Sequence, residues 1–250
     1  MSGEDLFRAE NIHKSYGSVK ALSGVDFRVG YEEIVGLIGD NGAGKSTLVN
    51  IIAGSLSKDK GKIYWRGEEV EIPSVRAARD LGIETVYQDQ AVVDTLSVAE
   101  NIFLSREPQF SAGPIKLLDR EKMRKEAKEI TERLDLDIPS PDHEVRFCSG
   151  GERQGVAIGR AMHFDAELVI LDEPTTALSV SGVERVMDFI GQLRESGVSC
   201  IFITHNMHHA FSISDRFVVL KKGKKIADVE REETSVDDLK RIQMSKELEQ

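Results

Sequence analysis

The sequence predicts an α/β protein whose core is a mostly parallel sheet with helices packed against it. Short, almost wholly apolar runs at residues 33–38, 168–171, 199–204 and 217–220 are typical of buried strands. Segments with helical apolar spacing separate several of these runs, and strands that alternate with helices form parallel sheets. A chain of 250 residues is also long enough to bury such a core without disulfides.

The composition fits a globular protein and disfavours one class of partner. The chain is 40% hydrophobic and 30% charged, and 33 Lys+Arg against 43 Asp+Glu give a net charge of −10. Binding to a nucleic-acid backbone needs clustered basic residues, so we expect no nucleic-acid partner. The two cysteines form no CxxC pair, which argues against a disulfide framework and against zinc.

Neither the N-terminal residues nor the apolar runs predict a membrane segment. The first ten residues are acidic where a signal peptide is basic, and no apolar h-region follows them. No uncharged apolar run approaches the roughly 18 residues that a transmembrane helix needs. If the protein serves a membrane, we expect another chain to cross it.

The first third of the chain is predicted to be rich in strands. Residues 6–16 and 21–29 mix apolar and polar positions, as half-exposed strands do. The buried strand at 33–38 ends in a glycine-rich turn, and residues 45–53 are then expected to form a helix. Further strands are expected at residues 63–65 and 83–87.

The middle third is predicted to be a helical insert at about residues 90–163. Ser97 and Glu100 form a capping-box pattern that opens one helix. A charged amphipathic helix is expected at 119–136 and another at 152–163, with a loop at 108–114.

The final third alternates again between strands and helices. An apolar stripe at helical spacing marks a helix, and it consists of Val183, Val186, Met187, Ile190 and Leu193. The lysine-rich stretch 221–225 is expected to be a solvated hairpin turn. We expect one domain over 1–250, with a core lobe at about 1–89 and 164–230 and a C-terminal helix within 231–250.

Residues 39–46 read Gly-Asp-Asn-Gly-Ala-Gly-Lys-Ser and fit the phosphate-binding loop pattern G-x-x-x-x-G-K-[ST]. The glycines let backbone N–H groups turn toward phosphate oxygens, and a helix N-terminus favours anions. Lys45 is expected to reach the β- and γ-phosphates, and the Ser46 hydroxyl to bind Mg²⁺. The chain is therefore predicted to be a P-loop NTPase. The expected nucleotide-binding residues of this loop are Gly39, Asp40, Asn41, Gly42, Ala43, Gly44, Lys45, Ser46 and Thr47.

Two carboxylates follow the buried strand at 168–171. In open α/β sheets the carboxyl ends of the strands form the ligand-binding edge. Asp172 is expected to hold Mg²⁺, and Glu173 to act as general base on the attacking water.

These motifs together resemble the ATP-binding subunit of an ABC transporter. Gln88, within Val-Tyr-Gln-Asp, sits at the position of the family's Q-loop glutamine. Cys-Ser-Gly-Gly-Glu at 148–152 resembles the family's signature LSGGQ, and residues 174–179 occupy the D-loop position. His205 matches the switch histidine, and Tyr16 the aromatic that stacks on adenine. The resemblance covers about residues 6–229 and implies a catalytic core with an antiparallel β subdomain and a helical signature subdomain.

The resemblance also implies a mechanism and two cofactors, ATP and Mg²⁺. Two copies would sandwich two ATP molecules, with the signature of one copy closing on the nucleotide held by the other. The signature residues of this contact would be Ser149, Gly150, Gly151 and Glu152. The implied catalytic residues are Lys45, Gln88, Glu173 and His205, and the implied metal ligands are Ser46, Gln88 and Asp172.

The chain departs from the family pattern at three positions. Cys148 replaces Leu, and we expect it to pack beneath the signature loop. Glu152 replaces Gln near the ribose position, where a carboxylate is expected to alter affinity more than chemistry. Ser179 replaces the Asp of many members, so cross-dimer coupling through this residue does not carry over.

Three segments resemble those of the ATP-binding subunits of bacterial simple-sugar importers, the ribose- and fructose-type group. They are residues 96–104, 152–158 and 205–211. The resemblance implies a homodimer of ATP-binding subunits, an integral membrane permease and, indirectly, a periplasmic or extracellular sugar-binding protein. It also implies a peripheral position on the cytoplasmic face of the inner (plasma) membrane.

Two other classes share part of this pattern. The ATPase subunit of a lipid or drug exporter would keep every catalytic residue and differ in its membrane partner. A soluble ABC ATPase acting on ribosomes or DNA would need a second ATP-binding domain or long coiled coils. The short insert between Gln88 and Cys148 shows no sustained heptads, which disfavours the second class.

Overall fold

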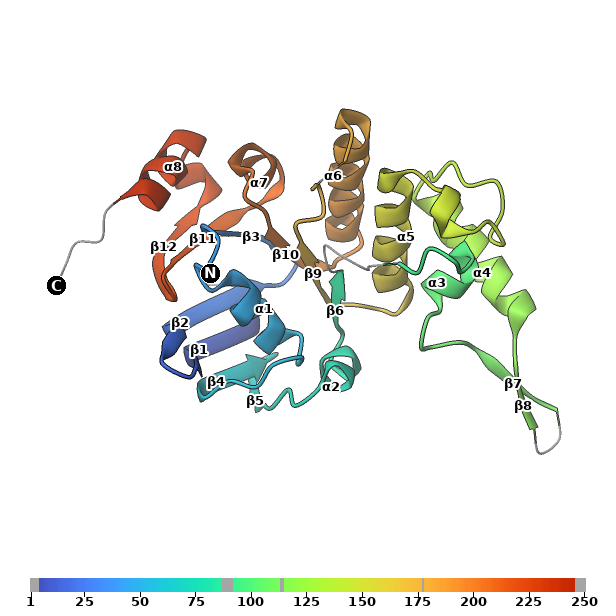
Figure 1. The fold of residues 1–250 in the computed structure, drawn as a ribbon, viewed down its shortest axis with the longest axis horizontal. Helices are drawn as coiled ribbons and strands as arrows, with labels where there is room; N and C mark the ends of the chain where they lie inside the picture. Colours follow the sequence, from blue (N-terminus) through green and yellow to red (C-terminus); the bar gives the residue numbers. More distant parts are fainter. Residues whose placement is uncertain (1–4, 87–91, 113–114, 177, 246–250) are drawn as a thin grey trace. The chain divides into compact units, whose positions relative to one another are not determined.

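The computed structural model describes residues 5–86, 92–112, 115–176 and 178–245. The chain divides into two compact units (Figure 1). The first unit comprises Met1–Thr85, Ala166–Glu173 and Ile190–Gln250, and the second comprises Val86–Asp165 and Pro174–Phe189. Each unit is described by itself.

A six-stranded sheet runs through the first unit in the order β12-β11-β3-β10-β9-β6. Its strands are β3 (Ile34–Ile38), β6 (Ile83–Val86), β9 (Leu168–Asp172), β10 (Ser199–Ile203), β11 (Arg216–Lys221) and β12 (Lys224–Glu230). Strands β9, β10, β3 and β11 pair in parallel, and β12 adds antiparallel to β11. All residues of β3 and β10 are buried, as their apolar sequences predict. The mostly parallel core is thus confirmed.

A second sheet of the first unit is antiparallel, with the strand order β2-β1-β4-β5. Its strands are β1 (Asp5–Tyr16), β2 (Val19–Gly30), β4 (Lys60–Trp65) and β5 (Glu68–Val70). Inward residues such as Phe7 and Phe27, whose ring centroids lie 6.5 Å apart, join one core cluster with side chains of β3, β9, β10 and β11.

Helices cover the parallel sheet of the first unit from two sides. They are α1 (Lys45–Ile52), α2 (Val75–Asp80), α7 (Met207–Ile213) and α8 (Val236–Met244), with a 3₁₀ turn η2 (Arg231–Glu233) before α8. Figure 1 shows α1 on the side of the antiparallel sheet, and α7 and α8 on the other side of β3 and β11. Helix α1 contacts β2, whereas α7 packs on β3 and α8 packs on α7 and β11.

The second unit is mainly helical. It contains α3 (Val98–Ile102), α4 (Arg120–Arg133), the 3₁₀ turn η1 (Val145–Phe147), α5 (Gly150–His163) and the beginning of α6 (Val180–Glu195). Helices α3, α4 and α5 pack against one another. The predicted capping box is confirmed, because Ser97 accepts from the Glu100 backbone N–H and the Glu100 carboxylate accepts from the Ser97 N–H.

Two sequence expectations for the second unit are wrong. A hairpin of β7 (Gln109–Ala112) and β8 (Ile115–Leu118) occupies part of the segment 108–114, where we expected only a loop. Apolar Phe110, Ile115 and Leu117 alternate with polar residues there, which is the period-2 pattern of a strand. Helix α5 begins at Gly150, two residues before the expected start, because Ser149 caps it.

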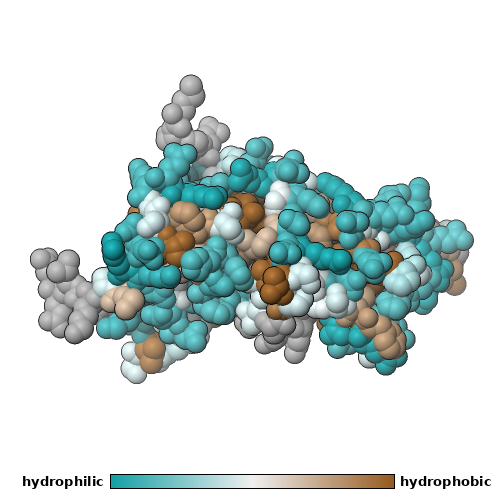
Figure 2. Space-filling view, turned by 90° about the horizontal axis from the view of Figure 1, so that it is seen from above, coloured by the Kyte–Doolittle hydropathy of each residue, from teal (hydrophilic) through white to brown (hydrophobic). Residues whose placement is uncertain are grey.

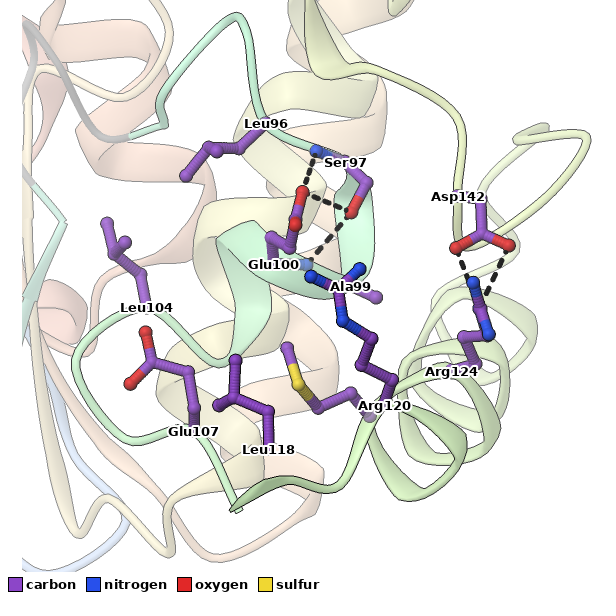
Figure 3. A pocket seen from close by; sticks show the side chains of 11 residues that line it. Leu96, Ser97, Ala99, Glu100, Leu104, Glu107, Leu118, Arg120, Arg124 and Asp142 are labelled. Atoms are coloured by element: carbon purple, nitrogen blue, oxygen red, sulfur yellow. Dashed lines mark hydrogen bonds and ion pairs between the residues drawn. The ribbon is translucent and has the colours of Figure 1, made fainter. Parts of the chain in front are cut away.

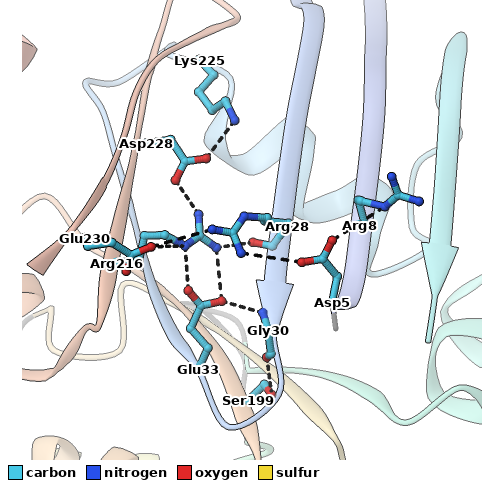
Figure 4. Close-up of polar contacts among 10 residues, drawn as sticks. All are labelled: Asp5, Arg8, Arg28, Gly30, Glu33, Ser199, Arg216, Lys225, Asp228 and Glu230. Atoms are coloured by element: carbon cyan, nitrogen blue, oxygen red, sulfur yellow. Dashed lines mark hydrogen bonds and ion pairs between the residues drawn. The ribbon is translucent and has the colours of Figure 1, made fainter. Parts of the chain in front are cut away.

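A buried arginine connects β11 with its surroundings in the first unit (Figure 4). The side chain of Arg216 is 1% exposed. Its guanidinium donates to the Glu33 carboxylate at 2.6 Å, to the Asp228 carboxylate at 2.5 Å and to the Arg28 carbonyl at 2.8 Å. The cluster therefore ties β11 to β12 and to the β2–β3 connection.

Figure 2 shows a face covered largely by hydrophilic side chains, with smaller separate hydrophobic areas. Among the residues that the structure describes, no helix is long and apolar enough to cross a membrane.

Candidate nucleotide-binding and hydrolysis site

The glycine-rich loop leaves β3 and enters α1 in a path that only glycine allows at two positions. A Cβ on Gly39 would lie 2.4 Å from the Leu220 carbonyl oxygen. A Cβ on Gly44 would lie 2.7 Å from the Ala21 carbonyl oxygen, and Gly44 has a φ of +106°. Because both sites lack room for a side chain, the loop can follow this path into the N-terminus of α1 only with glycine at these two positions. This is the geometry of an anion-binding loop.

Lys45 opens α1 and is buried beneath the loop. Its ammonium group donates to the Gly39 carbonyl at 2.6 Å and to the Asp40 carbonyl at 3.1 Å. Burial lowers the pKa of Lys45, while the negative charges of Glu173, Asp172 and Asp40 raise it. A desolvated ammonium group is suited to bind an anionic phosphate, because the negative charge of the phosphate stabilises the charged form of the lysine.

Parallel pairing brings the predicted acids to the same edge of the sheet. Ile203 of β10 pairs with Leu37 of β3 and with Asp172 of β9, so the three strands end together. The Glu173 backbone N–H donates to the Ile203 carbonyl at 2.9 Å. Glu173 has a φ of +51°, in the left-handed region that non-glycine residues rarely adopt.

The Glu173 side chain meets the predicted switch histidine. Nδ1 of His205 lies 2.9 Å from Oε2 of Glu173. The Glu173 side chain is 14% exposed, whereas that of His205 is 71% exposed. An ionised carboxylate only accepts, so Nδ1 donates when Glu173 is charged, and the histidine then orients the carboxylate.

Asp172 is half-buried at the end of β9. Burial and the neighbouring charge of Glu173 raise the pKa of Asp172, and the charge of Lys45 lowers it. A bound cation would relieve this unfavourable charge. No cluster of three His, Cys, Asp or Glu side chains suited to a metal exists among the described residues. Mg²⁺ needs none, since it binds one or two protein oxygens together with substrate phosphates, and Asp172 with the exposed Ser46 hydroxyl fits that donor set.

Two further predicted nucleotide-binding residues, Tyr16 and Asp40, belong to the first unit. Tyr16 ends β1, is 51% exposed and has the Lys14 ammonium 6.0 Å from its ring centroid. Asp40 accepts a hydrogen bond on its carboxylate from the Gln243 side-chain amide at the end of α8. Sequence reasoning missed Gln243, because nothing local to α8 marks it as a partner of the phosphate loop.

The signature residues lie in the second unit. Ser149 caps α5 and Glu152 completes a capping box, in which the Ser149 N–H donates to Glu152 Oε2 at 2.6 Å. Cys148 is buried, as expected, and burial raises the pKa of its thiol. Ser179 accepts at 3.2 Å from the Gly182 N–H and so caps the first turn of α6.

The structure therefore brings four predicted residues of the first unit together: Lys45, Asp172, Glu173 and His205. It places the signature residues in the second unit. Gln88, predicted as a metal and catalytic residue, lies outside the described residues.

A cavity of about 170 Å³ in the second unit contains none of the predicted nucleotide residues (Figure 3). One part of its lining is apolar and includes Leu104 and Leu118. The other part is charged, and there the Arg124 guanidinium donates twice to the Asp142 carboxylate, at 2.8 and 3.0 Å. The cavity is thus distinct from the signature residues of the same unit.

Comparison with known proteins defines the class. Residues 22–176 match the family model described as ABC transporter. The chain belongs to the ABC transporter family, and it is an ATPase of the ATP-binding cassette type.

Two of the similar proteins match over nearly their whole length. The xylose/arabinose import ATP-binding protein XylG of Sulfolobus acidocaldarius is 41% identical over 241 residues, covering 96% of this chain and 94% of that protein. The fructose import ATP-binding protein FrcA of Rhizobium meliloti is 38% identical, covering 95% of this chain and 93% of that protein. The ribose import ATP-binding protein RbsA 1 of Streptomyces avermitilis is 39% identical, but this chain spans only 47% of its length.

Solved structures support the same fold. A nucleotide-free ATP-binding cassette from an ABC transporter has a TM-score of 0.82 and 26% identity, covering 95% of this chain and 94% of that chain. A dimeric post-hydrolysis state of the cassette MJ0796, bound to ADP and Pi, has a TM-score of 0.75 and 26% identity, covering 90% and 98%. The predicted P-loop NTPase fold is confirmed.

Proposed function

We propose that this chain is the ATP-hydrolysing subunit of a sugar importer, and that it works as a homodimer beneath a separate membrane permease. The observation that carries the chemistry is the contact of Glu173 with His205 beside Lys45 and Asp172. The sugar assignment is supported by the relatives, which are import proteins for xylose/arabinose, fructose and ribose.

In this proposal each residue of the first unit has one task. The loop N–H groups and Lys45 bind the triphosphate, and Tyr16 stacks on adenine. Glu173 accepts a proton from the attacking water, and His205 holds the Glu173 carboxylate in place across 2.9 Å. The left-handed backbone conformation of Glu173 sets the direction in which its side chain leaves the main chain.

Ser46 and Asp172 would hold Mg²⁺, together with Gln88, which lies outside the described residues. When bound there, Mg²⁺ neutralises phosphate charge. The signature residues Ser149, Gly150, Gly151 and Glu152 close on the nucleotide of a second copy, with the N-terminus of α5 directed at its γ-phosphate.

The permease, and indirectly an external sugar-binding protein, complete the assembly. The position implied is the cytoplasmic face of the inner (plasma) membrane, which the subunit reaches through the permease. This part of the proposal is supported by family membership and by the names of the relatives.

Hydrolysis is tested with the Glu173→Gln variant. We expect purified wild-type protein to hydrolyse Mg·ATP, and the variant to lose roughly 10²–10⁴-fold in kcat, because an amide does not accept the proton. The variant should also form an ATP-dependent dimer in size-exclusion chromatography. Glu232→Gln, an exposed carboxylate of η2, is the matched control and should keep wild-type kcat. Unchanged hydrolysis in Glu173→Gln would remove Glu173 from the base role.

The sugar assignment needs the complete transporter. With its permease and sugar-binding protein in proteoliposomes, ATP hydrolysis should rise when a pentose or hexose is added outside. Stimulation by a lipid or drug in place of any sugar would support an exporter and refute sugar import, while leaving the ATPase assignment intact.

A further inference from the structure

Two of the departures from the family pattern, Glu152 and Ser179, lie in the same pocket of the second unit. The pocket is formed by the signature residues 149–152 and by the beginning of α6, and it also contains Arg185. Where the family pattern has neutral Gln and acidic Asp, this chain has acidic Glu152 and neutral Ser179. Both the family pattern and this chain therefore have one carboxylate at these two positions. In this chain the carboxylate belongs to the signature, at Glu152, and not to position 179.

A carboxylate at position 152 creates an electrostatic conflict. In the proposed function, the N-terminus of α5 receives the γ-phosphate of ATP held by a second copy. Glu152 N–H donates to Ser149 Oγ at 3.3 Å, which leaves the N–H groups of Gly150 and Gly151 without an intrahelical partner. These donors attract phosphate, whereas the negative charge of Glu152 within the same turn repels it.

Arg185 lies beside that charge. A Cβ on Gly151 would come within 3.2 Å of Gly182 Cα, so the first turns of α5 and α6 approach closely. Arg185 follows Gly182 by three residues and shares its helix face. Its Nη1 lies 3.9 Å from Glu152 Oε1, while the other oxygen of that carboxylate accepts from the Ser149 N–H. The Glu152 side chain is 14% exposed and the Arg185 side chain 43%, so the guanidinium is the more accessible of the pair.

We propose that Arg185 is a positioning residue of the signature: it neutralises and holds the Glu152 carboxylate, so that the α5 N-terminus keeps its affinity for the triphosphate on the second copy. This inference rests on the proposed function, in which the signature acts across the dimer. Arg185 has no task in binding ATP to the copy that carries it. Its loss should therefore weaken dimer formation and leave nucleotide affinity of the single subunit unchanged.

The test uses full-length protein that carries Glu173→Gln, so that ATP-bound dimers persist. The dimer dissociation constant at saturating Mg·ATP is measured by analytical ultracentrifugation, and nucleotide affinity of the dilute subunit by a fluorescent ATP analogue. Arg185→Ala should raise the dimer dissociation constant about tenfold with unchanged nucleotide affinity. Arg185→Lys should keep most of the dimer affinity, because it retains the charge. Arg124→Ala, which removes an exposed, ion-paired arginine outside this pocket, is the matched control and should dimerise normally.

The decisive variant is the double substitution Arg185→Ala with Glu152→Gln. If Arg185 acts by neutralising Glu152, removing both charges should restore dimer affinity to within about twofold of the parent. A double variant as weak as Arg185→Ala alone would overturn the proposal, because a packing role of Arg185 would not be rescued by Glu152→Gln. Normal dimerisation of Arg185→Ala would also overturn it. Failure of the Glu173→Gln parent to dimerise with ATP would instead refute the proposed function on which this inference depends.

Discussion

At the scale of single residues, the site contains charged side chains that are partly removed from water and one residue with an unfavourable backbone conformation. Lys45 is desolvated among carboxylates, Asp172 is half-buried beside Glu173, and Glu173 has a left-handed backbone. Each feature costs stability, and such perturbed groups cluster at functional sites. In the proposed function, a triphosphate with a cation would balance the charges of Lys45 and Asp172. The sequence motifs identified the residues, but only the structure shows the backbone of Glu173 and its contact with His205.

Replacing Glu173 by glycine should stabilise the protein while it abolishes hydrolysis. A left-handed φ costs a non-glycine residue about 1 kcal/mol, and glycine removes that cost. We expect the free energy of unfolding to rise by about 1 kcal/mol and Tm by about 2–4 °C in calorimetry. Glu173→Gln is the control, because it removes the charge beside Asp172 and keeps the strained backbone. An equal rise in Tm for both variants would assign the effect to charge repulsion and contradict the backbone explanation.

At the scale of helices and strands, prediction succeeded where local pattern and tertiary environment agree. The apolar runs became β3, β9, β10 and β11, because a strand buried on both faces needs no alternation. The hairpin β7–β8 was missed because its short strands flank a Gly-Pro pair that we interpreted as part of a loop. The Arg216 cluster was also not predictable. Arg216 lies on β11, whereas its partners Glu33 and Asp228 lie in the β2–β3 connection and on β12, and no sequence motif marks them as a group.

Removing the buried arginine should destabilise the first unit strongly. Arg216→Ala leaves the Glu33 and Asp228 carboxylates without their shared cation, and breaking such a buried ion pair costs about 3 kcal/mol. Urea unfolding should show this loss. Arg28→Ala is the matched control, because the Arg28 side chain is 46% exposed and its contacts to Asp5 and Glu230 are 3.7 and 3.8 Å long. It should cost less than about 1 kcal/mol. Equal losses in the two variants would contradict a special role for the buried cluster.

The same cluster predicts a dependence on pH. Burial opposes the charge of Asp228, but the hydrogen bond from Lys225 and the charge of Arg216 outweigh it and hold the pKa of Asp228 below its ordinary value. A lowered carboxyl pKa stabilises the folded state above the ordinary value, and this stabilisation is lost as pH falls through the lowered one, below about pH 4. Burial raises the pKa of Glu230, which contributes with the opposite sign and at higher pH. In Arg216→Lys, which keeps a charge but not the three-way contact, the acid-side loss measured by urea unfolding should begin at higher pH. If the free energy of unfolding depends on acid pH in the same way in both proteins, Arg216 does not set the pKa of Asp228.

At the scale of the whole molecule, the predicted nucleotide-binding residues divide between the two units. The loop, Asp172, Glu173 and His205 belong to the first unit, whereas the signature belongs to the second. The order of the motifs in the sequence predicts both sets. It was not sufficient to predict Arg185 or Gln243, because their roles arise from contacts between helix ends and not from a pattern along the chain. Nucleotide binding by one copy should therefore affect residues of the first unit, whereas dimer formation should also affect the signature residues of the second unit.

Hydrogen exchange with and without Mg·ATP should resolve these two events in the Glu173→Gln protein. At a protein concentration well below the dimer dissociation constant, nucleotide at 100 times its own dissociation constant should stabilise the subunit by about 2.7 kcal/mol. The added protection should then appear around residues 39–47 and 172–173 of the first unit only. At high protein concentration, protection should extend to residues 149–152, because the signature of one copy then covers the nucleotide of the other. Removing Mg²⁺ with EDTA should weaken both effects, and Lys45→Ala should abolish them. Protection of residues 149–152 that is independent of protein concentration would place the signature on the nucleotide of its own copy and contradict the dimer mechanism.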